Sequence, residues 1–369
     1  NGKDIAISLD YDIQNMIKDK LAKYTGSAVV MNAKTGGVLA SVSNPSFDNN
    51  SFVNGINTKS WKKLLENPER PLLNRVLSGH YAPASTSKMV VALAALSEGL
   101  INEHEKINCV GRTKLGRRYF HCWKEHGHGQ MNMTQAIASS CDIYFYELGK
   151  RLGIDKITKY AKIFGMGESL KFELDNRPGL MPTRLWKRIR DKNNRWSKGD
   201  DLVASIGQGY LLATPLQLAV MMARLNTGKM VTPTIKAAPK DTNFAGVGIA
   251  ESSLDIIRKG MDMVVNDQRY GTAFYRRSRK HRILGKTGTA QVISRRFDKD
   301  TNINDIPYEH RNNALYVAYF DDKETPLALS LVLEHAGSGS KAAGIGNKLL
   351  DKIIPIVQSY QDKKENNNV

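Results

Sequence analysis

Three short motifs place nucleophilic and proton-transferring side chains at close spacing, and the first pairs Ser85 with Lys88. The pair opens a stretch whose apolar residues recur at helical spacing, so both side chains lie on one helix face. A serine hydroxyl becomes a nucleophile when a neighbouring base removes its proton, and a lysine with a lowered pKa can be that base. The pair indicates acyl transfer, although a capping serine followed by a surface lysine has the same spacing.

The second motif is a hydroxyl and a carboxylate two residues apart, Ser140 and Asp142. Both fall in a stretch over residues 134–152 whose periodicity predicts helix. Such a pair could carry a proton along a short path. Two polar residues at a bend in a helix are the structural alternative.

The third motif reads Lys286, Thr287, Gly288 and Thr289, and we expect it to open a strand over residues 290–294. Glycine lets a ligand approach the backbone closely, and a lysine with two hydroxyls suits a bound carboxylate. The motif therefore predicts a binding edge. An exposed strand edge protected by a charge is the alternative.

All three cysteines lie close together in the sequence, at Cys109, Cys122 and Cys141, with His128 between them. Three thiolates and one imidazole form a set suited to a closed tetrahedral zinc site. A disulfide between Cys109 and Cys122, with Cys141 left over, uses the same residues differently. Three unpaired thiols are the third possibility, and the spacing alone leaves all three open.

The elements that must position these motifs follow from hydrophobic periodicity. A helical stretch at residues 13–21 precedes two extended stretches, and three more extended stretches occur near the other end of the chain. The expected strands cover residues 28–31, 38–42, 289–294, 314–320 and 327–333. We expect an α/β fold of the α+β type, with a central antiparallel sheet of about five strands covered by helices on both faces and an inserted, mostly helical lobe.

The same pattern predicts one domain in two parts. The sheet subdomain would comprise residues 1–84 and 264–360, and the helical lobe residues 85–263. The polar residues 361–369 are expected to form a disordered tail.

Composition limits the class of protein further. The chain has 369 residues, of which 41% are hydrophobic, and a formal net charge of +18. No apolar run approaches the roughly 20 residues that span a bilayer. The basic residues are spread along the chain without a reading motif, which argues against nucleic-acid binding and favours a solvated basic surface or attraction to an anionic partner.

In this order, the three motifs are those of penicillin-binding proteins and class A β-lactamases. Over nearly its whole length the chain resembles the transpeptidase domain of class B penicillin-binding proteins, most closely the elongation-specific type known as penicillin-binding protein 2. The residues at 36–48, 206–219 and 285–291 carry the resemblance beyond the motifs. Two positions depart from the common pattern: Asp142 stands where most members have Asn, as is typical of the elongation branch, and Ala84 where Gly often precedes the nucleophile.

The resemblance implies the penicillin-recognising serine transferase fold and a peptidoglycan D,D-transpeptidase that cross-links stem peptides during lateral wall synthesis. Ser85 would attack the peptide as nucleophile, and Lys88 would accept its proton. Ser140 would relay the proton to the leaving amine, while Asp142 and Lys286 would shape the electrostatic field.

The resemblance also implies how the substrate is held. Thr287 and Thr289, beside Gly288, would hold its terminal carboxylate, and the backbone N–H groups of Ser85 and Thr289 would form an oxyanion hole. β-Lactams would acylate the same serine. Because residues 83–86 also resemble class D β-lactamases, a β-lactamase or β-lactam sensor of the same fold is the alternative.

Further expectations concern cofactors, partners and place in the cell. The chemistry requires no cofactor, and members of the elongation branch can carry a metal here, which favours structural zinc at Cys109, Cys122, His128 and Cys141. The resemblance implies a missing N-terminal membrane anchor and pedestal, and partners that include the glycan polymerase RodA and the scaffold MreC. It places the domain on the periplasmic side of the bacterial inner membrane.

Overall fold

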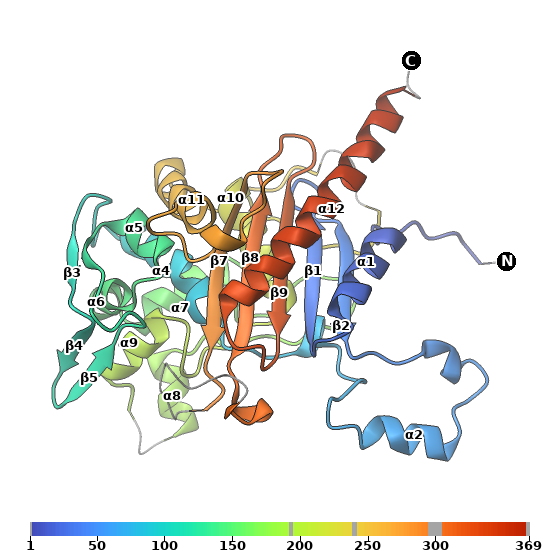
Figure 1. The fold of residues 1–369 in the computed structure, drawn as a ribbon, viewed down its shortest axis with the longest axis horizontal. Coiled ribbons are helices and arrows are strands. Elements are labelled where there is room, and N and C mark those ends of the chain that lie inside the picture. The colour runs from blue at the N-terminus through green and yellow to red at the C-terminus, as the bar shows by residue number, and fades with distance from the viewer. Residues whose placement is uncertain (1, 192–194, 238–241, 294–304, 367–369) are drawn as a thin grey trace.

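A five-stranded antiparallel sheet of order β2-β1-β9-β8-β7 forms the centre of the computed structural model, which describes residues 2–191, 195–237, 242–293 and 305–366 (Figure 1). Its strands are β1 (Gly26–Asn32), β2 (Val38–Asn44), β7 (Ile283–Ala290), β8 (Asn313–Phe320) and β9 (Leu327–Leu333). Two strands come from the start of the chain and three from its end, so the predicted α/β architecture with one central antiparallel sheet is confirmed.

Helices cover both faces of this sheet. On one face, α1 (Tyr11–Leu21) packs against β1 and β2, and α12 (Gly339–Asn366) packs against β7, β8 and β9. On the other face, α3 (Arg75–Ser78) and α10 (Pro215–Thr227) contact the central strands. Every residue of β9 is buried and seven of the eight in β8 are, because both sides of these strands meet apolar helices.

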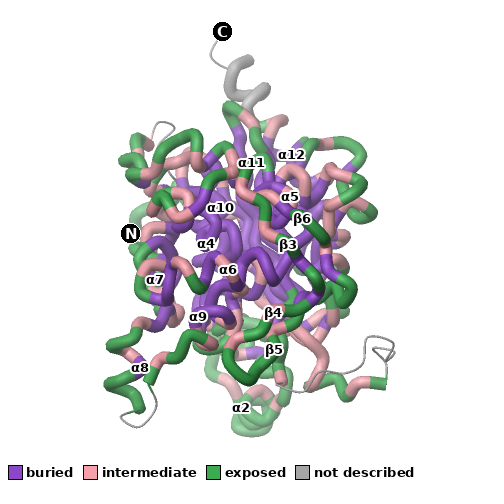
Figure 2. The backbone as a smooth tube through the Cα atoms, turned by 90° about the vertical axis from the view of Figure 1, so that its left-hand side faces the viewer, coloured by how far each residue is buried: buried purple, intermediate pink, exposed green. Residues whose placement is uncertain are grey.

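The helical lobe is inserted between β2 and β7. Besides α10, the lobe contains the helices α4 (Lys88–Ser97), α5 (Met133–Ala138), α6 (Asp142–Leu152), α7 (Ile154–Ile163), α8 (Arg184–Arg190), α9 (Lys198–Ser205) and α11 (Glu251–Asn266). Figure 2 shows α4, α6 and α10 largely buried in the middle of the molecule. None of the helices within the described ranges is both long enough and apolar enough to cross a membrane.

Helix α10 shows why the sequence folds locally as it does. Thr214 and Gln217 form a reciprocal capping box at its start, and Pro215 occupies the first turn, where its missing N–H costs nothing. Gly228 ends the helix at φ +64°, a conformation that glycine adopts without strain. Every residue of the helix except Thr227 is buried.

One prediction inside the lobe is wrong, and one feature of the lobe was not predicted. The expected helix over 134–152 is two helices, α5 and α6, because the chain turns between them with Ser140 at φ +54°. The lobe also contains strand pairs that its sequence barely signals. They are β3 (Ile107–Cys109) with β6 (Gly129–Met131), and β4 (Arg112–Leu115) with β5 (Arg118–His121).

The predicted strand over 290–294 is also wrong in its bounds. Strand β7 ends at Ala290, so the third motif lies inside it instead of opening it, and residue 294 lies outside the described residues. Glycine and lysine have low strand propensity, so the part of β7 that contains them was not predicted as strand. Here the glycines permit close approach: a Cβ at Gly285 would lie 2.6 Å from the Tyr316 hydroxyl.

Two peripheral segments complete the fold. Helix α2 (Thr58–Leu65) and the 3-10 helix Asn49–Phe52 lie on an arm that projects from the body (Figure 1). No residue of these two helices is buried. Helix α12 continues through residues 361–366, which the sequence assigned to a disordered tail; Gln, Lys and Glu are strong helix formers. Residues 367–369 lie outside the described part of the chain.

Candidate active site

Backbone conformation and a backbone hydrogen bond hold the segment that carries Ser85 in place. Ser85 lies in a 3-10 helix (Ala84–Ser87) that runs directly into α4, whose first residue is Lys88. Ala84 adopts φ +48°, unusual for a residue with a side chain, and its N–H donates to the Gly207 carbonyl over 2.8 Å. A glycine at this position would avoid the strain.

Lys88 connects the first two motifs. Its amine is fully buried and donates to the Asp142 carboxylate oxygen Oδ1 over 2.7 Å, to the Ser140 carbonyl over 2.9 Å and to the Ser140 hydroxyl over 3.2 Å. It also lies 5.2 Å from the centre of the Phe145 ring. Within the described residues it makes no hydrogen bond to Ser85. The lysine therefore rests against the second motif, one helical turn from the serine.

The second motif occupies the turn between α5 and α6. Ser140 takes a left-handed backbone conformation there, which costs about 1 kcal/mol or more in a residue other than glycine. Strain of this kind persists where surrounding contacts hold it, and here both Lys88 and the following helix do so. The turn brings the Ser140 hydroxyl and the Asp142 carboxylate to the same amine.

Lys286 supplies the third motif from β7. Its side chain is fully buried, and burial lowers its pKa well below the ordinary value, with a smaller contribution from the Lys88 charge that Asp142 partly opposes. Its amine donates to the Thr287 carbonyl over 3.0 Å. Two buried lysines and one largely buried carboxylate thus share this site.

The two threonines of β7 differ in exposure. Thr287 is buried, and its hydroxyl shares a hydrogen bond of 2.8 Å with the Thr272 hydroxyl. Thr289 is exposed, and its hydroxyl accepts the Gly339 N–H over 3.1 Å. Gln208 donates its side-chain amide to the Thr289 carbonyl over 3.2 Å. Strand β7 is an edge strand of the sheet, so its outer side faces the lobe and a bound molecule could align along it.

Close packing ties this edge to the serine segment. A Cβ at Gly288 would lie 3.0 Å from the Thr86 methyl group and 3.4 Å from the Pro83 carbonyl oxygen. Strand β7 and the 3-10 helix of Ser85 are therefore in direct contact. The structure brings all three sequence motifs to one place between sheet and lobe.

The four predicted metal-binding residues also meet. One ligand atom from each of Cys109, Cys122, His128 and Cys141 lies within 4.8 Å of the others. The His128 nitrogen Nδ1 is 3.6 Å from the Cys109 sulfur and 3.5 Å from the Cys122 sulfur. All three cysteines are free, so the disulfide alternative is not what the structure shows.

The chemistry of this cluster fits zinc. In a tetrahedral site with ordinary bond lengths, sulfur and nitrogen ligands lie about 3.6 Å apart, close to the two distances here. Hydrogen bonds from Cys122 and Cys141 lower the pKa of the Cys109 thiol, while hydrogen bonds to Cys109 and Cys122 raise the pKa of Cys141. The other ring nitrogen of His128 is buried and has no hydrogen-bond partner among the described residues. Its ring lies against Trp123 at 5.3 Å.

Three residues at this site lie outside the three motifs, although one of them, Gln208, falls in the segment 206–219 that carries the family resemblance. Thr272 contacts Thr287, Gln208 contacts Thr289, and Trp123 donates its backbone N–H to the Asp142 oxygen Oδ2 over 2.9 Å. Trp123 directly follows Cys122, which is the one sequence signal that could have drawn attention to it.

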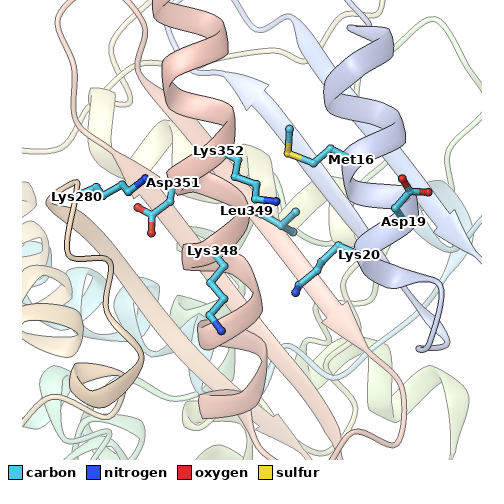
Figure 3. Close-up of a pocket in the computed structure, with 8 residues that line it drawn as sticks. All are labelled: Met16, Asp19, Lys20, Lys280, Lys348, Leu349, Asp351 and Lys352. Atoms are coloured by element: carbon cyan, nitrogen blue, oxygen red, sulfur yellow. The ribbon is translucent and has the colours of Figure 1, made fainter.

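A separate cleft lies away from these motifs. It has a volume of about 610 Å³ and lies between α1, α12 and the segment before β7, on the sheet face that α1 and α12 cover (Figure 3). Its lining residues are Met16, Asp19, Lys20, Lys280, Lys348, Leu349, Asp351 and Lys352. None of them belongs to the three motifs.

Comparison with known proteins agrees with this geometry. The family model described as "Penicillin binding protein transpeptidase domain" matches residues 26–351. The Peptidoglycan D,D-transpeptidase MrdA of Escherichia coli (strain K12) is 34% identical over 367 residues, which cover 96% of this chain and 58% of that protein. The chain thus spans less than two thirds of the length of this relative.

Solved structures give the same result. The complex between penicillin-binding protein PBP2 and MreC from Helicobacter pylori superimposes with a TM-score of 0.87 at 33% identity, covering 95% of this chain and 64% of that one. A chain of a peptidoglycan synthase complex that couples polymerization and crosslinking gives a TM-score of 0.82 at 28% identity, covering 95% and 62%. With the motifs assembled and the match spanning nearly the whole sequence, the chain belongs to the family of penicillin-binding protein transpeptidase domains.

Proposed function

We propose that this chain is the catalytic part of a peptidoglycan D,D-transpeptidase that cross-links stem peptides through a serine acyl-enzyme during lateral wall synthesis. The observation that carries the proposal is the contact set of Lys88, whose buried amine touches Ser140 and Asp142 one helical turn from Ser85. A base, a relay hydroxyl and a nucleophile in this order suit acyl transfer.

The proposed reaction has two halves. The Ser85 hydroxyl attacks the carbonyl of the penultimate D-alanine while its proton passes to Lys88. The peptide bond breaks, Ser140 relays a proton to the departing nitrogen, and the terminal D-alanine leaves. An amine from a neighbouring stem peptide then attacks the ester, forms the cross-link and returns the proton to Ser85.

The third motif would hold the substrate. A stem peptide lying along β7 would place its terminal carboxylate at the hydroxyls of Thr287 and Thr289, beside Lys286. Backbone N–H groups of Ser85 and Thr289 would stabilise the oxyanion, a contribution often worth about 3 kcal/mol per donor. Asp142 would offset the charge of Lys88, with which it forms an ion pair.

The Cys109, Cys122, His128 and Cys141 cluster would bind a structural zinc ion. The ion would supply no chemistry to the reaction, which needs no cofactor. It would fasten the loop after β5 to the turn that contains Cys141, and Cys141 lies between the two residues of the second motif.

The wider setting is proposed from the relatives. The two complexes described above favour MreC as a scaffold partner and a glycan polymerase such as RodA as a second. We propose that a segment outside this chain anchors it to the inner membrane, with this domain on the periplasmic side. The division into a sheet subdomain (1–84 and 264–360) and a lobe (85–263) is likewise proposed.

The test supplies the chain with a stem pentapeptide ending in D-Ala-D-Ala and a second stem peptide as acceptor. Mass spectrometry should detect free D-alanine and a cross-linked dimer, both absent with Ser85→Ala. Rapid hydrolysis of a penicillin without any dimer would instead identify a β-lactamase.

A further inference from the structure

Trp123 contacts the second motif through both of its N–H groups. Its backbone N–H donates to the Asp142 oxygen Oδ2 over 2.9 Å. Its indole N–H donates to the Ser139 carbonyl over 3.0 Å and to the Ser140 carbonyl over 3.2 Å. One residue of the loop after β5 therefore spans the whole turn between α5 and α6.

These acceptors are shared with Lys88. The lysine amine and the Trp123 indole both donate to the Ser140 carbonyl, and the two residues occupy different oxygens of the Asp142 carboxylate. A carbonyl with two donors is fixed in direction, and so is the strained residue that carries it. The position of the lysine amine thus depends on groups that Trp123 holds.

The indole is itself held in place. Trp123 follows Cys122, and its ring lies edge-on to His128 at 5.3 Å, so two residues of the cysteine-histidine cluster flank it. Trp123 as a whole residue is nevertheless 52% exposed. An exposed indole could donate to water, and yet this one points its N–H inward to two backbone carbonyls.

We propose that Trp123 is a positioning residue, whose indole N–H fixes the Ser140 carbonyl and thereby sets the places of the Lys88 amine and the Ser140 hydroxyl relative to Ser85. The inference rests on the roles proposed above for Lys88 and Ser140. Trp123 touches neither the reacting atoms nor the proton that moves.

The decisive comparison removes the N–H and keeps the ring. Replacing Trp123 with β-(3-benzothienyl)-alanine exchanges the N–H for sulfur at nearly constant shape, and Trp123→Phe is a simpler second variant. Stopped-flow acylation by a penicillin separates the affinity of the initial complex from the rate of bond formation. We expect the acylation rate to fall about tenfold, since the single donor that both carbonyls share is lost, while affinity changes less than twofold.

The control is Trp61→Phe on the projecting arm, which should acylate at the wild-type rate. A benzothienyl variant that acylates like wild type would overturn the inference. So would a weaker affinity with an unchanged rate, which indicates a contact with the drug instead of positioning. The proposed function is tested separately: if the wild type acylates and Ser85→Ala does not, it holds whether or not the inference about Trp123 fails.

A spectroscopic readout needs no activity. The indole ¹H–¹⁵N signal of Trp123, assigned by its loss in Trp123→Phe, should exchange with water more than tenfold more slowly than that of an indole with the same exposure, because the N–H is hydrogen-bonded inside the protein. Exchange at the rate of a free indole would contradict the inference. Unchanged melting temperatures of the variants would show that the rate effect does not arise from unfolding.

Discussion

Lys88 and Asp142 form an ion pair of 2.7 Å in which the amine is fully buried and the carboxylate side chain is only 12% exposed. Buried ion pairs are weak contributors to stability, because desolvation offsets their attraction. Here a second buried lysine, Lys286, lies close enough for the Lys88 charge to lower its pKa further. Such an unfavourable grouping is typical of a site shaped for proton transfer.

Breaking this ion pair should affect both stability and acylation. In Lys88→Met the carboxylate of Asp142 remains buried without its cation, so unfolding in urea should show a loss of about 3 kcal/mol or more. Loss of the base should slow acylation about 10²- to 10⁴-fold. The control is Lys187→Met, which breaks the 2.7 Å pair with Asp200 elsewhere in the lobe and should destabilise without slowing acylation more than about threefold. Equal rates in the two variants would contradict the role of Lys88.

Lys286 makes stability depend on pH in a definite direction. Burial lowers its folded pKa below the ordinary 10.5, so between these two values the unfolded chain binds more protons. The wild type should therefore gain stability as pH rises through this window, and Lys286→Met should lack that gain. At pH 7 the variant should be more stable by about 1–2 kcal/mol and inactive in acylation. Urea unfolding from pH 7 to 10 measures this, and parallel curves would refute the assignment.

The backbone beneath Ser85 should not tolerate a methyl group. A Cβ at Gly207 would lie 2.1 Å from the Ala84 carbonyl oxygen, in a residue at φ +72°. Gly207→Ala should displace the 3-10 helix and reduce acylation by at least 100-fold, as measured by drug-adduct formation. Gly99→Ala is the matched control, since Gly99 also has a positive φ but a Cβ there would have no described atom within 4 Å. It should cost about 1 kcal/mol and leave the rate unchanged.

Metal removal tests the cysteine-histidine cluster. The purified protein should contain close to one zinc ion per chain by elemental analysis, and Cys109→Ser should lose it and melt at a lower temperature. His126→Ala alters a nearby exposed histidine outside the cluster and should retain the metal. A chelator should lower the melting temperature of wild type and of the control alike. Metal-free protein with an unchanged melting temperature would exclude structural zinc.

The sequence predicts the fold well where apolar runs are continuous. Strand β9 has the predicted bounds, and β8 begins one residue early, because their buried residues are nearly all apolar. Strand β7 was misplaced because its burial depends on neighbours. Lys286 and the glycines beside it were placed before the strand, because only the packing of Tyr316 and the serine segment against them favours a strand there.

The candidate site was predicted as far as local spacing extends. The serine, lysine and cysteine motifs name residues that the fold brings together. Contacts between distant elements cannot be predicted from the spacing of residues along the chain. Thr272, for example, meets Thr287 only because the chain after α11 returns beside β7. At Ser140 the sequence offered a bend in one helix only as an alternative, and the full break could not be predicted because its left-handed backbone is held by Lys88 from another helix.

The central claim is that Ser85 is the nucleophile of an acyl-transfer enzyme. Intact-protein mass spectrometry over several hours after mixing with a penicillin tests it directly, with Ser85→Ala alongside. The account predicts a lasting gain of one drug mass in the wild type and none in the variant, because water is poorly activated at the ester of a transpeptidase. An adduct that forms in the variant, or no adduct on folded wild-type protein, would contradict it.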